Sequence, residues 1–146
     1  MLLVGEWKIR DDGAARPTVR ANVQDGEGGL VAADFLLDSG ADRTVFCAAL
    51  LERWRLSAIS ARPGFSLSGI GGTSEFVLVT TVLEFTRDDG GPVRVRGEFA
   101  GFTDPAATDL SVLGRDVLDN FDLIVSRRRN EILLLAPRHQ YRIKGD

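Results

Sequence analysis

The sequence predicts an all-β protein, folded as a small closed barrel with a flap hairpin and one or two short helices. Short apolar stretches rich in β-forming residues recur along the chain, and clusters of glycine and aspartate separate them. Several of these stretches alternate along their length, as strands of a packed sheet do. Helix formers gather without a turn residue only around Ala48–Glu52, and one or two helical turns are expected after Gly114.

The first third of the chain is expected to form strands joined by hairpin turns. Turn residues stop the first strand at Asp11-Asp12-Gly13, and a glycine-rich segment from Asp25 to Gly29 makes the next hairpin connection. The Asp11-Asp12-Gly13-Ala14 segment is interpreted as a turn. The predicted strands here are Leu2–Arg10, Thr18–Val23 and Leu30–Leu37.

The middle of the chain predicts a helix and then a long hairpin. The helix falls within Phe46–Trp54, and Arg62-Pro63-Gly64 ends it. The second arm of the hairpin is apolar on both faces, as expected of a strand enclosed in a small barrel. The predicted arms are Phe65–Leu67 and Phe76–Phe85, followed by a turn at 87–92, a strand at Val93–Phe102 and a loop at 103–109.

The last third predicts short helical turns over Arg115–Asn120 and a closing hairpin. Phe121–Val125 and Ile132–Leu135 are expected to pair across a basic tip, which we interpret as a solvated turn. A polar tail at 137–146 follows, and its His139 is expected to be exposed.

Length and composition limit the function. The 146 residues are expected to form one domain (1–146), with residues 1–15 as an N-terminal extension strand. The net charge is −3 and no basic stripe with interleaved aromatic residues occurs, which argues against nucleic-acid binding. No window is apolar for long enough to predict a signal peptide or a membrane span. The single cysteine, Cys47, fits a buried small residue and a reducing compartment, so the cytoplasm is expected.

One acid lies where its neighbours predict burial. Asp38 follows the apolar run Phe35-Leu36-Leu37 directly and is followed by Ser39-Gly40. Burying a lone carboxylate costs several kcal/mol unless something compensates it. Asp38 is therefore either a well-bonded structural acid or a carboxylate held half-buried for chemistry.

Three segments resemble the retropepsin-like aspartic protease family, in the family's order. The first, Leu36-Leu37-Asp38-Ser39-Gly40-Ala41-Asp42, resembles the catalytic loop. The second, Ser68-Gly69-Ile70-Gly71-Gly72, is similar to the tip of the flap. The third, Val112-Leu113-Gly114-Arg115-Asp116-Val117-Leu118, resembles the Gly-Arg-Asp/Asn segment near the end of the fold. The resemblance runs from about residue 16 to 135 and is closer to cellular members than to retroviral ones.

The resemblance implies a homodimeric endopeptidase. This chemistry needs an acid and a base on one water molecule, and the chain carries one Asp-Ser-Gly triplet. The second carboxylate would then be Asp38 of another copy, in a C2 homodimer. Two carboxylates about 4 Å apart repel by about 4 kcal/mol at an effective dielectric constant near 20, so the pair would share one proton. Neither a metal nor an organic cofactor is required, and the implied substrate is an extended, largely apolar peptide.

The resemblance also assigns supporting roles. Ser39 would bond across the dimer axis, and Gly40 would allow close approach to the carboxylate. Ala41 replaces a hydroxyl residue of pepsin-like enzymes, so we expect a pH optimum less acid than pepsin's. Asp42 would receive the substrate main chain and pair with Arg115, whereas Asp116 is interpreted as a helix-start acid. Ser68, Gly69, Ile70 and Gly71 would form the flap over the substrate.

Two other classes of protein stay open from the sequence. One is a catalytically weak or inactive retropepsin-like module for dimerisation or peptide binding. The other is a plain β-barrel binding protein whose motifs match by accident. The hairpin at 121–135 replaces a very short retroviral strand, so the dimer sheet is expected to be built differently.

Overall fold

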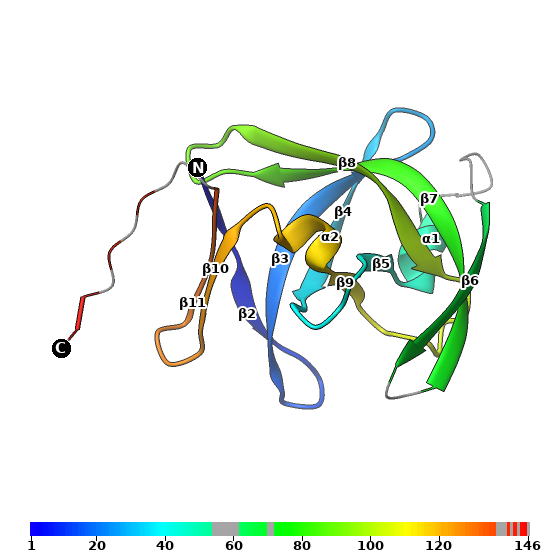
Figure 1. Ribbon diagram of the computed structural model, residues 1–146, viewed down its shortest axis with the longest axis horizontal. Coiled ribbons are helices and arrows are strands. Elements are labelled where there is room, and N and C mark those ends of the chain that lie inside the picture. The colour runs from blue at the N-terminus through cyan, green and yellow to red at the C-terminus, as the bar shows by residue number, and fades with distance from the viewer. Residues whose placement is uncertain (54–61, 70–71, 137–139, 141, 143, 146) are drawn as a thin grey trace.

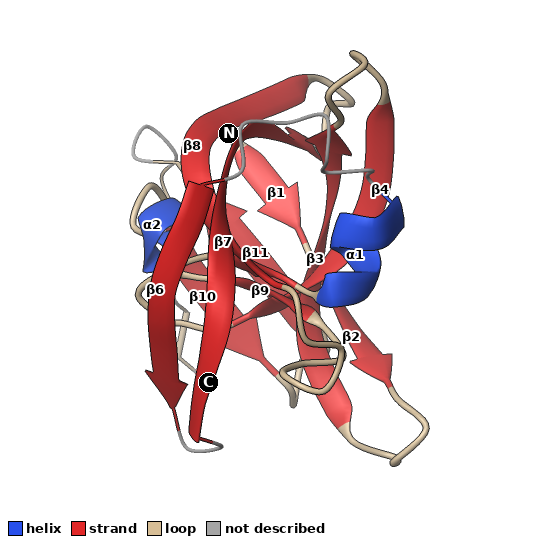
Figure 2. Cartoon of the chain, turned by 90° about the vertical axis from the view of Figure 1, so that its right-hand side faces the viewer, coloured by secondary structure: helices blue, strands red, loops and turns tan. Residues whose placement is uncertain are grey.

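The computed structural model describes residues 1–53, 62–69, 72–136, 140, 142 and 144–145. Strands dominate it, as the sequence predicts (Figures 1 and 2). The elements are β1 (Leu2–Val4), β2 (Glu6–Ile9), β3 (Ala15–Gln24), β4 (Leu30–Leu37), β5 (Val45–Phe46), α1 (Ala48–Arg53), β6 (Arg62–Gly69), β7 (Gly72–Thr86), β8 (Pro92–Phe102), β9 (Ser111–Leu113), α2 (Arg115–Leu118), β10 (Asp122–Ser126) and β11 (Glu131–Leu135).

The described strands form a closed barrel and a smaller sheet. The larger sheet has the order β2-β3-β4-β9-β5-β8-β7-β6, and an additional pairing of β3 with β7 closes six of these strands into a ring. The smaller sheet has the order β1-β11-β10. The prediction of a closed all-β barrel is therefore confirmed. No helix in the described part of the chain is long and apolar enough to cross a membrane.

Aromatic and branched side chains fill the barrel. Phe46 is fully buried, with its ring 5.9 Å from that of Phe35 and 5.7 Å from that of Phe99. Along β7 the residues Val79, Thr81, Leu83 and Phe85 are buried, whereas Thr80 is exposed. Both faces of this strand were expected to be apolar and enclosed. This is wrong for the face that carries Thr80, because that face points away from the interior of the barrel.

The predicted first strand is divided at Gly5. β1 pairs with β11 in the smaller sheet, whereas β2 pairs with β3 in the larger one. The amide of Gly5 donates to the carbonyl of Ile132 at 2.8 Å. A Cβ at position 5 would lie 2.6 Å from the carbonyl oxygen of Thr18 and 2.7 Å from the Ile132 side chain. Glycine is needed at position 5, where the chain passes from the smaller sheet to the larger one, because the backbone there has no room for a Cβ.

The smaller sheet packs on the barrel and extends its core. Leu3, Ile132 and Leu134 point inward and belong to the same buried cluster as Phe35 and Phe46. The hairpin predicted for residues 121–135 is confirmed, with β10 and β11 paired in continuous register. At its tip the Arg127 guanidinium lies 5.5 Å from the centre of the Trp7 ring.

The predicted hairpin turns are confirmed at residues 10–14, 25–29 and 87–91. In each one an aspartate carboxylate accepts backbone N–H groups within the turn, as Asp25 does from Glu27 and Gly29. Gly28 and Gly90 have φ of 85°, which favours glycine. The hydrogen bond from the Gly91 amide lowers the pKa of the Asp89 carboxyl.

The predicted short helix is α1, which buries Ala48, Leu50 and Leu51. It begins after Phe46, because Val45 and Phe46 pair with β8 as strand β5. Cys47 is buried, as predicted, and its amide donates to the Ser111 hydroxyl at 3.0 Å. Arg62-Pro63-Gly64, predicted to end the helix, is already part of strand β6, which is three residues longer at this end than the predicted arm Phe65–Leu67. Trp54 and most of the predicted tail lie outside the described residues.

Candidate active site

Asp38 lies at the point where two parallel strands end together. β4 and β9 pair in parallel, with Leu37 opposite Leu113. The amide of Asp38 then donates to the carbonyl of Leu113 at 3.1 Å, one residue beyond the last strand pair. The backbone of Asp38 is therefore held by the barrel itself, while the residues that follow it leave the strand.

The carboxylate of Asp38 is half-buried and is bonded by its own loop. Its Oδ1 accepts the Gly40 amide at 2.9 Å, and its carbonyl accepts the Ala41 amide at 3.2 Å. A Cβ at Gly40 would lie 3.2 Å from that Oδ1. Ser39 and Gly40 are exposed and Ala41 is half-buried. The loop thus presents the acid at the surface of the folded chain rather than in its core.

Helix α2 supports the loop from the other side. The amide of Arg115 donates to the carbonyl of Ala41 at 2.8 Å, and the amide of Asp116 donates to the carbonyl of Asp42 at 3.2 Å. Two amides of the first turn of the helix, which lack partners inside it, are satisfied in this way. The helix start and the acidic loop are therefore one hydrogen-bonded unit.

Thr44 and Asp116 complete this unit inside the protein. Thr44 is fully buried, and both its amide and its hydroxyl donate to Oδ1 of Asp116, at 2.9 and 2.7 Å. The same hydroxyl accepts the Gly114 amide at 3.1 Å. Asp116 does lie in the first turn of α2, as expected, but its carboxylate also accepts hydrogen bonds from Thr44, the residue before β5. Sequence reasoning missed Thr44, because a threonine in an apolar run looks like an ordinary strand residue.

Gly114 allows the two segments to touch. A Cβ at this position would lie 2.4 Å from the carbonyl carbon and oxygen of Arg43. Any side chain at position 114 would push α2 away from the loop backbone at Arg43 and Thr44. The glycine in the Gly-Arg-Asp segment is therefore required by backbone packing.

Asp42 and Arg115 form an ion pair on the surface. The Arg115 guanidinium donates to Oδ1 of Asp42, although the two side chains remain 51% and 79% exposed. The hydrogen bond and charge of Asp42 raise the pKa of Arg115. The ion pair therefore lies on the surface beside the Asp38 loop and is not part of the core.

The ends of the predicted flap are strands. Ser68 pairs with Thr73 and Gly69 with Gly72, so β6 and β7 approach each other as the arms of a hairpin. Ile70 and Gly71, the proposed tip, lie outside the described residues. Within the described part of the chain, no three His, Cys, Asp or Glu side chains gather as metal ligands would.

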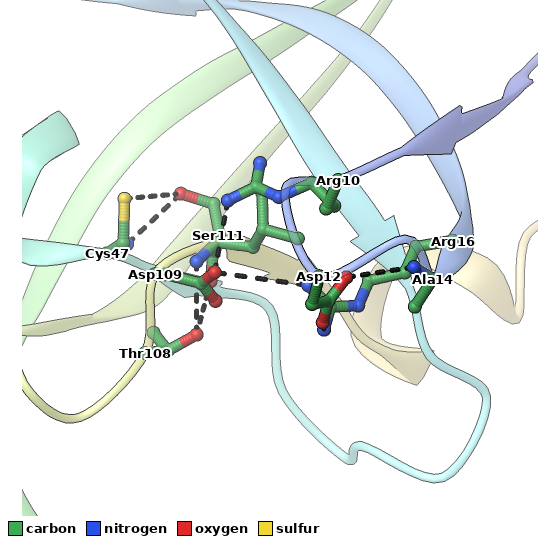
Figure 3. A network of polar contacts seen from close by, with 9 residues as sticks. Arg10, Asp12, Ala14, Arg16, Cys47, Thr108, Asp109 and Ser111 are labelled. Atoms are coloured by element: carbon green, nitrogen blue, oxygen red, sulfur yellow. Dashed lines mark hydrogen bonds and ion pairs between the residues drawn. The ribbon is translucent and has the colours of Figure 1, made fainter.

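A charged network holds the loop that leads into β9 (Figure 3). Asp109 accepts the Arg10 guanidinium at 3.0 Å and lies 3.9 Å from that of Arg16, which also binds Asp12 at 2.7 Å. The turn between β2 and β3 is thereby linked to the segment before Ser111. This segment continues into the strand that bonds Asp38.

These features together define the class of fold. A closed six-stranded barrel carries an Asp-Ser-Gly loop at the end of β4, and a Gly-Arg-Asp helix start bonds that loop. This is the retropepsin-type fold of aspartic proteases.

Solved structures agree with this assignment. A retropepsin-like aspartic protease from Rickettsia conorii is similar to the chain with a TM-score of 0.58 and 14% identity, covering 92% of this chain and 90% of the other. EIAV protease in complex with the inhibitor HBY-793 is similar with a TM-score of 0.52 and 23% identity, covering 71% and 86%. No protein-family model and no curated protein matches the sequence. At these identities the likeness establishes the fold.

Proposed function

We propose that the chain is an aspartic endopeptidase that works as a C2 homodimer. The observation that carries the proposal is the placement of Asp38, half-buried and bonded to Leu113 and Gly40 at the end of β4. One chain has one such acid, so the second carboxylate is Asp38 of another copy. A reducing compartment such as the cytoplasm suits a chain whose single cysteine is buried.

In this mechanism the two Asp38 carboxyl groups share one proton over one water molecule. The ionised carboxylate takes a proton from the water as it attacks the peptide carbonyl. The protonated carboxyl donates a hydrogen bond to the developing oxyanion, and a proton then passes to the leaving amine. Each Asp38 is the acid or the base according to which one carries the proton.

The surrounding residues would bind the substrate and position the loop. Ser39 is exposed beside Asp38, where it would bond across the two-fold axis, and Gly40 and Ala41 shape the turn. Asp42, paired with Arg115, would bind the main chain of an extended, largely apolar peptide substrate. The segment Ser68-Gly69-Ile70-Gly71 would close over the peptide and exclude water.

Cleavage of a peptide library by the wild type and by Asp38→Asn tests the proposal. We expect cleavage by the wild type between about pH 3 and 8, inhibition by a pepstatin-type compound, and none by Asp38→Asn. Asp11→Asn is the matched control, because Asp11 lies in an exposed turn and begins the segment Asp11-Asp12-Gly13-Ala14, which shares the pattern Asp-x-Gly-Ala with the Asp38 loop. Equal cleavage by both proteins would overturn the mechanism. A folded dimer that cleaves nothing would leave the inactive dimerisation or peptide-binding module.

Mixing the two proteins tests the shared site. If each active centre needs one Asp38 from each copy, an equimolar mixture that exchanges subunits keeps roughly a quarter of the activity of the same total amount of wild type. If each chain acted alone, half would remain. Asp11→Asn mixed with wild type should show no loss.

A further inference from the structure

A row of apolar side chains crosses the wall of the barrel and begins beside Asp38. Strands β4, β9, β5, β8 and β7 are neighbours in this order (Figure 1). Residues that lie directly opposite each other on neighbouring strands point to the same face of the sheet. The register therefore places five side chains in one row, namely Leu36, Val112, Val45, Ala100 and Leu78.

This row lies on the face of the wall that is turned away from the barrel interior. The residues next to it along the chain belong to the main buried cluster, as Leu37 and Phe46 do. The row itself contributes to a second and smaller cluster. That cluster consists of Val45, Phe76 and Ala100, with Leu78, Phe102 and Val112 only partly buried against it. The outside of the barrel thus has an apolar surface between the Asp38 loop and β7, the strand that leads out of the predicted flap.

Asp38 lies on the same face as this row. It comes two positions after Leu36, and its amide continues the pairing of β4 with β9 by donating to the Leu113 carbonyl. Side chains two positions apart along a strand point to the same face. An extended peptide bound at Asp38 would therefore lie over the apolar row.

A cation stands next to this surface. Arg43 is exposed and lies between Asp42, which is proposed to bind the substrate, and Thr44. The buried Thr44 side chain is turned toward Asp116 in α2. Successive side chains of an extended chain point to opposite sides, so the Arg43 side chain is expected on the side of Val45 and the apolar row.

The charge of Arg43 is not neutralised by the residues that the structure describes. Within residues 1–53, 62–69 and 72–136 it forms no ion pair, whereas Asp42 pairs with Arg115 and Asp116 binds Thr44. The chain as a whole has a net charge of −3, so its long-range field repels acidic peptides. Any preference for an acidic peptide must therefore come from a local cation such as Arg43.

We infer that Arg43 selects peptides that carry an acidic side chain near the apolar residues at the cleaved bond. Its guanidinium would bind the substrate carboxylate through charge-assisted hydrogen bonds. The inference rests on the proposed homodimeric function and names its substrate class. Because a C2 dimer places one Arg43 on each side of the cleaved bond, acidic residues should be favoured on both sides.

Cleavage of matched peptides tests this preference. The peptides share an apolar centre and carry Glu, Gln or Lys at one position, which is varied along both sides of the cleaved bond. At the best position, wild type should have a kcat/KM roughly two- to tenfold higher for the Glu peptide than for the Gln peptide, and lowest for the Lys peptide. The preference should weaken in high salt, because the Arg43 side chain is exposed.

Substitutions of Arg43 show whether it is the cause. Arg43→Lys should keep the preference for Glu, Arg43→Gln should abolish it, and Arg43→Glu should favour the Lys peptide. Urea unfolding checks that the variants fold as the wild type does. Arg96→Glu is the matched control, because it makes the same change of charge on the same outer face, farther along β8 from the apolar row. It should keep the preference for Glu.

The outcomes separate this inference from the proposed function. A wild type that cleaves peptides without preferring Glu, or an Arg43→Glu protein that keeps the wild-type preference, would overturn the role of Arg43 and leave the enzyme standing. Fluorescence anisotropy of the same peptides with Asp38→Asn covers the other case. If the wild type cleaves nothing, but Asp38→Asn binds Glu peptides most tightly and loses this when Arg43→Glu is added, the enzyme fails and the role of Arg43 stands. Absence of both cleavage and this binding preference would overturn both.

Discussion

The hydroxyl of Thr44 donates to Oδ1 of Asp116 at 2.7 Å across the junction between the acidic loop and helix α2. The same oxygen accepts the Thr44 amide, and the Thr44 hydroxyl accepts the Gly114 amide. One buried side chain thereby connects the end of the Asp38 loop, the start of the helix and the helix's own first acid. The first prediction follows from this relationship.

Asp116→Ala should destabilise the protein by about 1–3 kcal/mol, because two donors of the fully buried Thr44 lose their acceptor. Asp116→Asn keeps a carbonyl oxygen and should cost much less. Urea unfolding measures both changes. If the two variants were equally unstable, the negative charge rather than the hydrogen bonds would hold the junction.

Gly114→Ala should lower the free energy of unfolding by at least about 1 kcal/mol, because the added methyl would overlap the Arg43 carbonyl. Gly145→Ala is the control, because a Cβ there meets nothing within 4 Å. Thermal unfolding of the two variants measures the difference. A Gly114→Ala protein as stable as the wild type would show that α2 can shift freely from β5.

Gly40→Ala should lower kcat by roughly ten- to a hundredfold with little change in the free energy of unfolding. The added methyl would lie 3.2 Å from Oδ1 of Asp38 and would displace the carboxylate without disturbing the core. Steady-state kinetics on a cleaved peptide, together with unfolding curves, separates the two effects. Unchanged kcat would mean that Oδ1 of Asp38 has room to move.

Arg115→Lys and Asp42→Asn should leave the free energy of unfolding nearly unchanged, because the ion pair is exposed to water and salt. Their effect is expected in KM, since Asp42 is proposed to receive the substrate. The raised pKa of Arg115 means that any stability the guanidinium adds is present below its unfolded pKa and is lost only above its folded pKa. The pair should therefore persist when the pH is raised to about 10. A stability loss between pH 8 and 10 that depends on Arg115 would contradict this assignment.

Asp89→Asn should reduce the acid sensitivity of the β7–β8 hairpin. The Gly91 amide lowers the pKa of Asp89, so the carboxylate stabilises the turn above its unfolded pKa, and this contribution is lost as the pH falls through the folded value. Hydrogen exchange of the Gly91 amide at pH 6 and pH 3 measures it. Equal acid sensitivity in the variant and the wild type would exclude Asp89 as the cause.

Local patterns in the sequence were sufficient to predict the elements next to the site. The apolar run before Asp38 gave β4 with its observed limits, and the two apolar runs around the basic turn gave the β10–β11 hairpin. In both cases period-two burial and turn chemistry agree with the tertiary structure. The segments flanking the three motifs were accordingly predicted with few errors.

What the sequence did not reveal depends on contacts between distant residues. The predicted hairpin arm began at Phe65, whereas β6 also includes Arg62, Pro63 and Gly64, because β6 is an edge strand, where a missing N–H group is tolerated. Gly5 divides a regular strand pattern because Ile132 and Thr18 occupy the space beside it. The role of Thr44 depends on Asp116, which lies 72 positions away in the sequence.

Strand β1 pairs with β11 of its own chain, and this has a consequence for how the protein could be controlled. The main-chain groups of β1 that face β11 are hydrogen-bonded within one chain. These residues would therefore stay folded when two copies of the chain separate. Association would then be a reversible equilibrium between intact bodies. Under the proposed mechanism, the cellular abundance of the polypeptide would itself switch proteolysis on and off.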